Sequence, residues 1–454
     1  MNFDNRTIFA PSTQVGESGI TVIRISGKDA FSTLSKIFSK KADEFSPVDF
    51  TKTPSHSAIH GYLTEGVDVI DEAVVTIFKS PNSYTGEDVA EISSHGGGYI
   101  YRKINNLLSI HGVEHAEPGE FSKRAFLNGK MDLAQAEAVA DLIRAKTDLS
   151  NKLAIKQLLG EFSGKIKELR EELINYCSLL ELELDFSEEG LDLVSKQELL
   201  SKIETLITRF NGLTRSFESG KIIINGVNLA IVGKPNVGKS SIFNYLLNQN
   251  RAIVSEIPGT TRDYLQEPLI MGGVVFNLID TAGIRNSDDT IEQEGVKRTR
   301  QKIAESDIVI EVEDLSNPKS DGTEYIVGIP EEKIVRAFNK ADITTNTGIK
   351  GLQVSALAGT NMIKLQDEIV KKAKALIRED ESSDVIITNE RHRDCLLKSC
   401  EYLVNAKLQI ESGGGNELIS YEIRSAMDSL TEIIGKTTNV DILHNIFAKF
   451  CIGK

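Results

Sequence analysis

The sequence predicts a multidomain chain of α/β plus α class, in which a doubly wound α/β domain interrupts a helical one. Three observations support this prediction. At 454 residues the chain is too long for one hydrophobic core, so about three domains are expected. The residue pattern changes from strand-rich to helical along the chain. The helical pattern then stops and returns after a stretch of alternating strands and helices.

Residues 1–118 read as the N-terminal α/β domain. Apolar, β-rich runs such as Ile20 to Ile25 and Ala73 to Phe78 are bounded by Gly, Ser, Pro or Asn. From Asp132 the pattern is helical. Its clearest apolar positions are Ile166, Leu169, Leu173, Cys177, Leu180 and Leu184, with Lys and Glu between them.

From Val227 to about Ile377 strands and helices alternate, as in a doubly wound sheet. Helical spacing returns after Asp384 and runs to Phe450, interrupted by the Gly413 to Gly415 loop. We therefore expect residues 119–220 and 380–454 to form one helical domain, with residues 221–379 inserted into it. The ends of a compact domain often lie close together, so such an insertion disturbs its host little.

Composition narrows the class of protein. Hydrophobic residues make up 40% and charged residues 26%, and no apolar stretch approaches the roughly 20 residues of a membrane-spanning helix. The first residues resemble neither a secretory signal nor a transit peptide, which predicts a cytoplasmic protein. The four cysteines are scattered, so neither a disulfide framework nor a zinc site is expected. A net charge of -14 argues against RNA affinity spread over the whole surface.

A nucleotide site follows the strand Val227 to Val232. The next residues, Gly233-Lys234-Pro235-Asn236-Val237-Gly238-Lys239-Ser240, match G-x-x-x-x-G-K-[ST] between a strand and a helix. In this motif backbone N–H groups surround phosphates, Lys239 reaches the β and γ oxygens, and Ser240 binds Mg²⁺.

Further elements in the expected order complete the prediction of a guanine nucleotide site. Gly259-Thr260-Thr261-Arg262-Asp263 is a candidate switch, and Asp280-Thr281-Ala282-Gly283 follows the strand VVFNLI. In Asn339-Lys340-Ala341-Asp342, the Asp342 carboxylate can accept from the two N–H groups of guanine. Ser355-Ala356-Leu357 completes the base pocket.

The predicted hydrolytic centre lacks two usual groups. Small signalling GTPases orient water with a glutamine after D-x-x-G, but here that residue is Ile284. The following acidic segment offers Asp288, Asp289, Glu292 and Glu294, most of which we expect to be solvated loop residues. No arginine finger is evident. A potassium ion bound by the Asn236 side chain and by carbonyls of residues 255–260 could supply its charge.

Several longer segments of the sequence carry a family resemblance. They are the N-terminal blocks TGEDVAEISSHGG and PGEFSKRAFLNGKMDLAQAEA, the motifs GTTRD and DTAG, and the terminal CIGK. Together with the nucleotide motifs they show that the chain resembles the MnmE (TrmE) family of bacterial tRNA-modification GTPases from end to end. The resemblance implies a folate-binding N-terminal domain that dimerises, and a helical domain that carries a Ras-like GTPase domain. It also implies a flavoprotein partner, MnmG, in a heterotetramer. The two proteins would add a carboxymethylaminomethyl or aminomethyl group to C5 of the wobble uridine, U34, of certain tRNAs.

The resemblance also assigns residues. It implies that Arg24, Glu91 and Lys130 bind 5-formyl- or methylene-tetrahydrofolate, with Lys454 nearby. It implies potassium ligands at Asn236, Ser255, Ile257 and Thr260, and magnesium ligands at Ser240 and Thr261, with Ser255 and Pro258 as small departures from the commoner residues. Glu292 lies at the spacing of the family's water-orienting glutamate. Together with Lys239 and Cys451, it is an expected catalytic residue. The expected nucleotide-site and cation-site residues are Asn236, Val237, Gly238, Lys239, Ser240, Ser241, Ser255, Glu256, Ile257, Pro258, Gly259, Thr260, Thr261, Asp280, Thr281, Ala282, Gly283, Asn339, Lys340, Ala341, Asp342, Ser355, Ala356 and Leu357.

Alternatives remain open at this stage. Arg24 and Glu91 could be surface residues, Lys130 could cap a turn, and Cys451 could lie on a frayed end. A second function class is a GTP-switched ribosome or RNA assembly factor. The acidic helical domain and the tail Cys451-Ile452-Gly453-Lys454, which follows an amphipathic helical pattern from Asp441 to Phe450, favour the tRNA-modifying enzyme.

Overall fold

The computed structural model describes residues 6–186, 195–250, 266–279, 303, 305–317, 326–344, 349, 351–377, 385–436 and 440–454. The chain divides into two compact units. The first comprises Met1–Ala140, Gln157–Glu168 and Thr431–Lys454, and the second comprises Asp141–Lys156 and Leu169–Leu430. Each unit is described by itself below.

The first unit is built on a seven-stranded sheet of order β3-β4-β5-β6-β2-β1-β7, which is antiparallel except for the β1–β7 pair. Its strands are β1 (Ile8–Pro11), β2 (Ile20–Ser26), β3 (Phe38–Ser39), β4 (Ser57–Glu65), β5 (Asp68–Phe78), β6 (Val89–His95) and β7 (Glu114–His115). The strands predicted at Ile20 to Ile25 and Ala73 to Phe78 are therefore confirmed.

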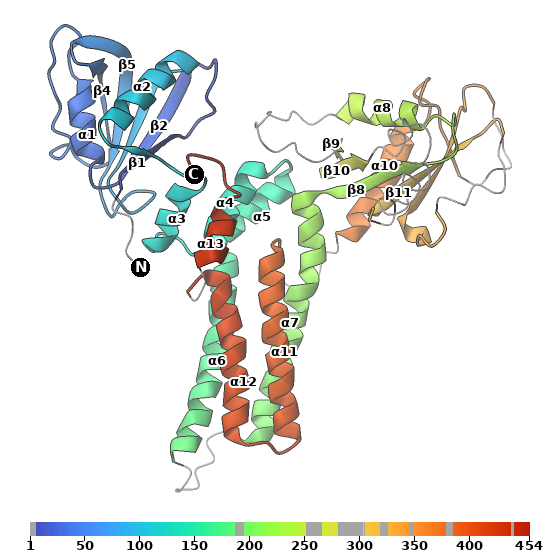
Figure 1. The fold of residues 1–454 in the computed structure, drawn as a ribbon. Coiled ribbons are helices and arrows are strands. Elements are labelled where there is room, and N and C mark those ends of the chain that lie inside the picture. Colours follow the sequence, from blue (N-terminus) through green and yellow to red (C-terminus); the bar gives the residue numbers. More distant parts are fainter. Residues whose placement is uncertain are drawn as a thin grey trace, which may run out of the picture. The chain divides into compact units, whose positions relative to one another are not determined.

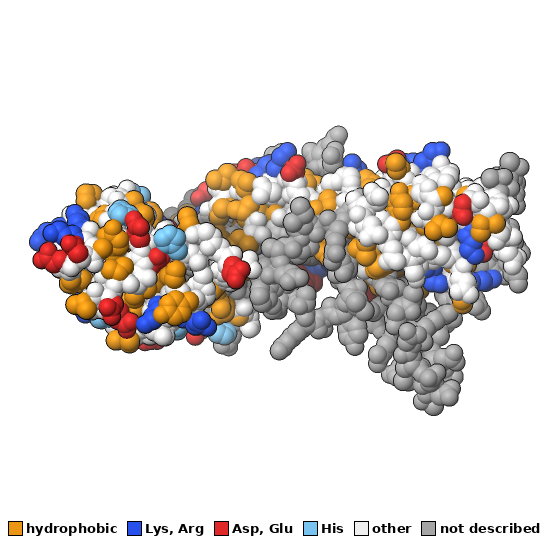
Figure 2. Space-filling model, turned by 90° about the horizontal axis from the view of Figure 1, so that it is seen from above, with side chains coloured by type: hydrophobic (Ala, Val, Ile, Leu, Met, Phe, Trp, Pro, Cys, Tyr) orange, Lys and Arg blue, Asp and Glu red, His pale blue; other side chains and the backbone are white. Residues whose placement is uncertain are grey.

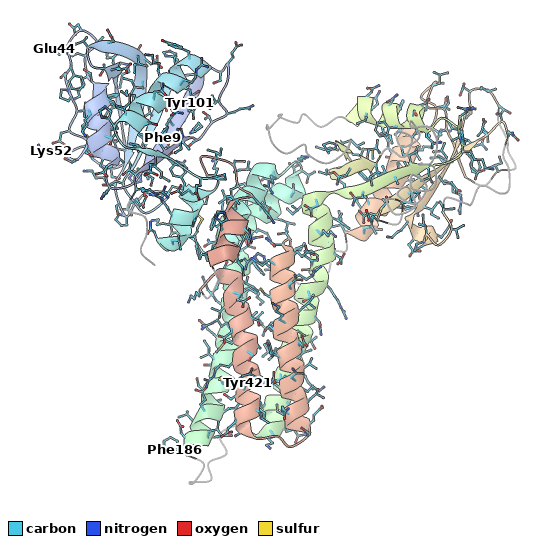
Figure 3. All side chains as sticks on the ribbon, in the orientation of Figure 1. Phe9, Glu44, Lys52, Tyr101, Phe186 and Tyr421 are labelled. Carbon is cyan, nitrogen blue, oxygen red and sulfur yellow. The ribbon has the colours of Figure 1, made fainter. Side chains whose placement is uncertain are left out.

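Two helices pack on one face of this sheet, α1 (Ala30–Ile37) and α2 (Gly98–Ile110) (Figure 1). Buried residues of both helices, including Leu34 and Leu108, share one apolar core with strand residues such as Ile25 and Val75. Figure 3 shows Phe9 inside this unit, with Glu44 and Lys52 at its periphery. The alternation of buried and exposed residues along β2 and β5 places one apolar face of each strand in that core.

A small helical cluster completes the first unit. It contains α3 (Glu120–Leu127), the first part of α4 (Leu133–Arg144) and α13 (Val440–Phe447). Leu133 and Ala136 of α4 pack against Leu443 and Phe447 of α13. The C-terminal helix is therefore anchored in the first unit, although it is remote from this unit's sheet in sequence.

Long helices dominate the second unit: α6 (Glu161–Asp185), α7 (Lys196–Asn225), α11 (Glu390–Glu411) and α12 (Asn416–Ile434), with α5 (Asp148–Leu158) before them (Figure 1). The first residues of α6 and the last of α12 belong to the first unit. Helix α7 packs along α11, and α6 contacts α12, where the Cys177 Sγ lies 3.3 Å from the Ser420 Oγ. Cys177, Cys395 and Cys400 are buried in these helices, as expected of small packing residues. The proposed boundary at residue 220 falls inside α7, which continues to Asn225.

The second unit also contains a six-stranded sheet of order β13-β12-β11-β8-β10-β9, parallel except for β9. Its strands are β8 (Val227–Val232), β9 (Gln266–Met271), β10 (Val274–Ile279), β11 (Ile308–Asp314), β12 (Ile334–Asn339) and β13 (Leu352–Gln353). Helices α8 (Lys239–Asn250) and α10 (Met362–Leu376) cover one face, and a second apolar cluster covers the other. A short helical turn, η4 (Glu331–Lys333), precedes β12.

Both the α/β and the α parts of the predicted fold class are thus confirmed. Buried residues lie on both faces of the parallel sheet, which is why its strands read as continuous apolar runs in the sequence. None of the described helices has both the length and the apolar character that crossing a membrane requires.

Candidate functional site: a phosphate loop and a polar site in the first unit

The phosphate loop lies between β8 and α8. Strand β8 ends at Val232 and α8 begins at Lys239, so residues 233–238 form the connecting turn at the helix N-terminus. The Lys239 Nζ donates to the carbonyl oxygens of Gly233 and Lys234 at 2.9 and 2.8 Å. Its ammonium group therefore lies across the loop, where the helix N-terminus also favours an anion. Ser240 and Ser241 follow in the first turn of α8, and both are exposed.

Asn339, at the end of β12, joins this loop to the predicted base pocket. Its buried side chain donates from Nδ2 to the Val237 carbonyl at 2.9 Å and accepts at Oδ1 from the Ala356 N–H at 3.1 Å. Gly238 has φ +98°, and a Cβ at that position would lie 2.0 Å from the Asn339 Nδ2. The second glycine of the motif is therefore required by the Asn339 side chain as well as by the turn.

The residues predicted to recognise guanine lie at adjacent strand ends. The buried Ser355 hydroxyl donates to the Asp342 carboxylate, and the Ala341 N–H donates to the Val354 carbonyl at 3.0 Å. These contacts bring the two predicted base-binding motifs together. Leu357 is 89% exposed, so its side chain lies open at the edge of this region.

Lys340 is fixed by an ion pair with Asp314 at the end of β11. Its backbone has φ +72°, an uncommon conformation for a residue other than glycine. Burial acts to raise the pKa of the Asp314 carboxyl, but hydrogen bonds from Lys340 and Ser316 outweigh it and lower that pKa below its usual value. Asp314 therefore stays ionised at neutral pH and holds the Lys340 side chain beside the pocket.

Several predicted site residues lie outside the described residues. They are Ser255, Glu256, Ile257, Pro258, Gly259, Thr260, Thr261, Asp280, Thr281, Ala282, Gly283 and Glu292. The described strand β10, which pairs with β8 in parallel, ends at Ile279, opposite Ala230.

A second polar site lies in the first unit, where β2 and β6 pair. Arg24 and Glu91 are direct partners in the antiparallel register. The Arg24 Nε donates to the Glu91 Oε1 at 2.9 Å, and the Nη2 lies 2.9 Å from the same oxygen. The Arg24 side chain is only 13% exposed. The structure thus brings together two of the residues that the family resemblance assigned to a folate ligand.

Aromatic rings surround the Arg24 guanidinium. Its central carbon lies 5.0 Å from the centre of the Tyr84 ring and 5.6 Å from that of Phe121. The Tyr84 hydroxyl lies 2.8 Å from the Ser122 Oγ, and burial raises the pKa of the Tyr84 phenol. Tyr84 therefore stays neutral and presents its ring to the cation.

The C-terminal tail reaches the same place. The Arg24 Nη1 lies 3.5 Å from the Gly453 carbonyl oxygen, to which it donates. Burial, and then the nearby Arg24 guanidinium, lower the pKa of the Lys454 ammonium below its usual value. Lys130 is tied to another segment, since its Nζ donates to the Pro81 carbonyl at 2.9 Å in the loop that also carries Tyr84.

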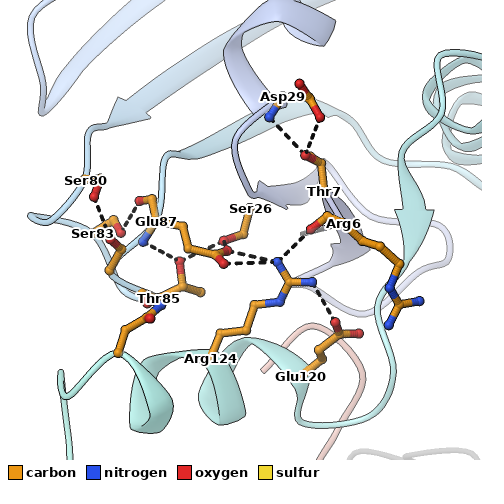
Figure 4. A network of polar contacts seen from close by, with 12 residues as sticks. Arg6, Thr7, Ser26, Asp29, Ser80, Ser83, Thr85, Glu87, Glu120 and Arg124 are labelled. Atoms are coloured by element: carbon orange, nitrogen blue, oxygen red, sulfur yellow. Dashed lines mark hydrogen bonds and ion pairs between the residues drawn. The ribbon is translucent and has the colours of Figure 1, made fainter. Parts of the chain in front are cut away.

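A buried ion network next to this site was missed by the sequence analysis (Figure 4). The Arg124 Nη1 donates to the Glu87 Oε2 at 3.0 Å, and its Nη2 donates to the Glu120 Oε1 at 2.8 Å. The Ser26 hydroxyl also donates to Glu87 at 2.7 Å. The i,i+4 spacing of Glu120 and Arg124 was the available signal, but Glu87 is 37 residues from Arg124. The network fixes α3, which carries Phe121, against the loop before β6.

Comparisons with known proteins identify the family of the chain. The family description "GTP-binding protein TrmE N-terminus" matches residues 7–130, and "MnmE helical domain" matches residues 133–451. The tRNA modification GTPase MnmE of Flavobacterium psychrophilum is 41% identical, over 99% of each chain. That of Thermoanaerobacter pseudethanolicus is 40% identical over the whole of both chains. Among solved structures, the G domain of the T. maritima FeoB iron transporter covers 32% of this chain and 98% of its own, with 28% identity and a TM-score of 0.25.

The parallel sheet, the phosphate loop and the Asn339 bridge to the guanine motifs define a P-loop GTPase, an enzyme that binds and hydrolyses GTP. Its relatives match it over its full length at well above the identity that a shared fold alone would give. The chain belongs to the MnmE family of tRNA modification GTPases.

Proposed function

We propose that this GTPase uses GTP hydrolysis to drive modification of C5 of the wobble uridine, U34, of certain tRNAs. The product carries an aminomethyl or carboxymethylaminomethyl group, and the flavoprotein MnmG is the partner in a heterotetramer. The observation that carries the proposal is the site around Arg24, which lies in the first unit and includes the chain's own C-terminal tail. A simple GTP-dependent timer has no use for such a site.

The residues around Arg24 fit a tetrahydrofolate. A guanidinium fork suits a carboxylate or a polar ring edge, and the Glu91 carboxylate can accept from the N–H edge of a pterin. Tyr84 and Phe121 flank the Arg24 guanidinium and so help to fix its orientation toward such a ligand. When bound, 5-formyl- or methylene-tetrahydrofolate would supply a one-carbon unit, held by Arg24, Glu91, Lys130 and Lys454. Cys451 is the proposed catalytic residue beside it.

Two cations are proposed for the nucleotide site. Mg²⁺ would be held by Ser240 and Thr261, and K⁺ by Asn236, Ser255, Ile257 and Thr260. Among the described members of these sets, Asn236 is exposed at the phosphate loop with φ +63°, and Ser240 is exposed at the start of α8. Both offer uncharged oxygen atoms of the kind that such cations bind.

Glu292 is the proposed water-orienting residue, because Ile284 can neither donate nor accept a hydrogen bond. Glu292→Ala should lower GTP turnover roughly 10²-fold or more with near-normal nucleotide affinity, and Glu294→Ala should do much less. If Glu294→Ala proves the more damaging change, the role belongs to Glu294.

The proposed domain organisation is an inserted one. Residues 1–118 would form the folate-binding and dimerisation domain, and residues 119–220 with 380–454 would form the helical domain that carries the GTPase domain, 221–379. Helix α7 precedes the α/β segment in the sequence and α11 follows it. Because these two helices pack together, they support the insertion. Ile20 and Tyr99 are exposed apolar side chains of the first unit. Figure 2 shows hydrophobic side chains among charged ones on the face that it draws, and such exposed apolar surface supports a homodimer. The cytoplasm, where tRNA is modified, is the proposed location.

Substitution of Cys451 tests the proposal. Cys451→Ser should abolish the modified wobble nucleoside in cells while leaving GTP hydrolysis and folding close to normal. Cys400→Ser is the matched control, because Cys400 is buried in α11 and should be dispensable for modification. Mass spectrometry of tRNA nucleosides gives the answer, and wild-type levels in the Cys451→Ser strain would refute a catalytic role for this thiol.

A further inference from the structure

The last residues of the chain follow a fixed path across the first unit. After α13 ends at Phe447, the side chains of Phe447 and Phe450 remain buried with Leu133 and Ala136 of α4. The next residues, 451–454, contact Pro11 and Arg24 near the start of the chain and Gly119 before α3. A free C-terminus usually frays, so specific contacts must hold this one in place.

Gly453 occupies a place that only glycine fits. Its φ is +90°, and a Cβ there would lie 2.0 Å from the backbone carbonyl oxygen of Pro11 at the end of β1. The clash would be with backbone, which cannot rotate away as a flexible side chain can. The Gly453 carbonyl in turn accepts from Arg24. Glycine at this position therefore lets the tail lie against β1 and reach the Arg24 guanidinium.

Gly119, before α3, forms a second close contact with the C-terminal segment. It has φ +70°, and a Cβ there would lie 2.6 Å from the Phe447 carbonyl oxygen and 3.0 Å from the Phe450 Cβ. Its N–H donates to the Cys451 carbonyl at 3.4 Å. Two close approaches therefore flank Cys451. Before it, the chain passes close to Gly119, and after it, Gly453 of the tail lies against Pro11.

We propose that Gly119 and Gly453 are positioning residues that dock the tail on the first unit and so hold Cys451 between its contact with Gly119 and the contact of Gly453 with Arg24. The importance of that position for tRNA modification rests on the proposed function, whereas the docking itself does not. The polar contacts that hold the tail are long, 3.4 and 3.5 Å, so each contributes little on its own. A methyl group at either glycine should therefore shift the tail to an undocked state.

Removal of the terminal residue measures docking directly. A carboxypeptidase specific for basic residues releases Lys454 only from an undocked tail, and intact-mass spectrometry of the full-length protein follows the reaction. Gly119→Ala leaves the tail sequence unchanged and should speed release about tenfold or more. Gly66→Ala is its control, because Gly66 has φ +65° and a Cβ there would meet nothing within 4 Å.

Gly453→Ala should have the same effect, with rates divided by those of a synthetic peptide of the same last eight residues to remove any preference of the peptidase. Gly112→Ala, at φ +81° with open space around the Cβ, is the matched control. An unchanged thermal unfolding curve, together with unchanged GTP hydrolysis, shows that both units of each variant keep their fold. Release from Gly119→Ala and Gly453→Ala at the rates of their controls would overturn the inference.

The wobble nucleoside separates this inference from the proposed function. Faster Lys454 release together with loss of the modified nucleoside in cells supports both. Faster release with normal modification supports docking by the two glycines and refutes the need for a docked Cys451. Unchanged release refutes the docking role, whatever the nucleoside level.

Discussion

At the scale of single residues, the Asn339 side chain connects the phosphate loop to the loop predicted to bind the base. One buried carboxamide satisfies the Val237 carbonyl of the phosphate loop and the Ala356 N–H of the base loop. A buried polar group with both ends paired stabilises one arrangement of the loops, because leaving either end unpaired costs about 1–3 kcal/mol. The Asn339 side chain therefore ties the phosphate loop and the base loop together in one arrangement.

Gly238→Ala should weaken nucleotide binding. Its Cβ would lie 2.0 Å from the Asn339 Nδ2, so either the loop or the Asn339 bridge must move. Strain of this kind typically costs about 1–3 kcal/mol, which corresponds to roughly a 5- to 150-fold rise in Kd for GDP. Equilibrium titration with a fluorescent GDP analogue measures it.

The control is Gly273→Ala in the turn between β9 and β10. Gly273 has φ +81°, and a Cβ there would meet nothing within 4 Å. Equal affinities for the two variants would mean that the approach of Gly238 to Asn339 is unimportant.

Arg24→Ala and Glu91→Ala should each weaken tetrahydrofolate binding without changing the GTPase rate. Each substitution leaves its partner half-buried without its ion pair and removes a group proposed to contact the ligand. Arg24→Lys should restore little, because an ammonium lacks the planar fork. Isothermal calorimetry with 5-formyl-tetrahydrofolate tests this, with Lys52→Ala, an exposed cation of the same unit, as control. Unchanged folate affinity in both variants would remove the assignment.

At the scale of secondary-structure elements, α3 connects the features of the first unit. It carries Phe121 against Arg24, it begins after Gly119 at the tail, and Arg124 ties it to Glu87. Because this helix has only eight residues, its position depends on these tertiary contacts more than on its own helix propensity.

Arg124→Met should loosen α3. The Arg124 side chain is 7% exposed, and its removal leaves the Glu87 and Glu120 carboxylates without their cation. Breaking a buried pair in this way costs about 3–5 kcal/mol. Hydrogen exchange of the α3 amides in the full-length protein should show a fall of that order in the free energy of local opening.

Arg209→Met serves as the comparison variant. Its ion pair with Glu172 is about one-third exposed, so its loss should lower the free energy of local opening by at most about 1 kcal/mol. Equal protection of the α3 amides in Arg124→Met and the wild-type protein would show that the network does not hold α3.

At the scale of the whole molecule, the proposed potassium site links hydrolysis to assembly. GTP turnover should rise strongly with KCl and little with NaCl at matched ionic strength, and the rise should coincide with pairing of two GTPase domains. The physical reason is that a cation at Asn236 would supply the charge of the arginine finger. Asn236→Ala should remove the potassium effect, whereas Asn248→Ala, on an exposed position of α8, should not. Steady-state rates with cross-linking between protomers measure both, and identical rates in the two salts would end this proposal.

The sequence by itself determined the fold class, the strands at Ile20 and Ala73, and the nucleotide motifs. These features are local: β8, the phosphate loop and α8 are contiguous, so residue spacing alone fixes which groups meet. The cysteines of the long helices were likewise predictable from their place in the apolar pattern. Only the tertiary structure decided the contacts around Arg24. Glu91 lies 67 residues away and Gly453 lies 429 residues away, and they meet Arg24 through strand register and tail docking. The sequence also did not predict the Glu87–Arg124 network or the contact of Lys130 with Pro81. Charged side chains pair with groups that are close in space, and those groups can be distant in sequence.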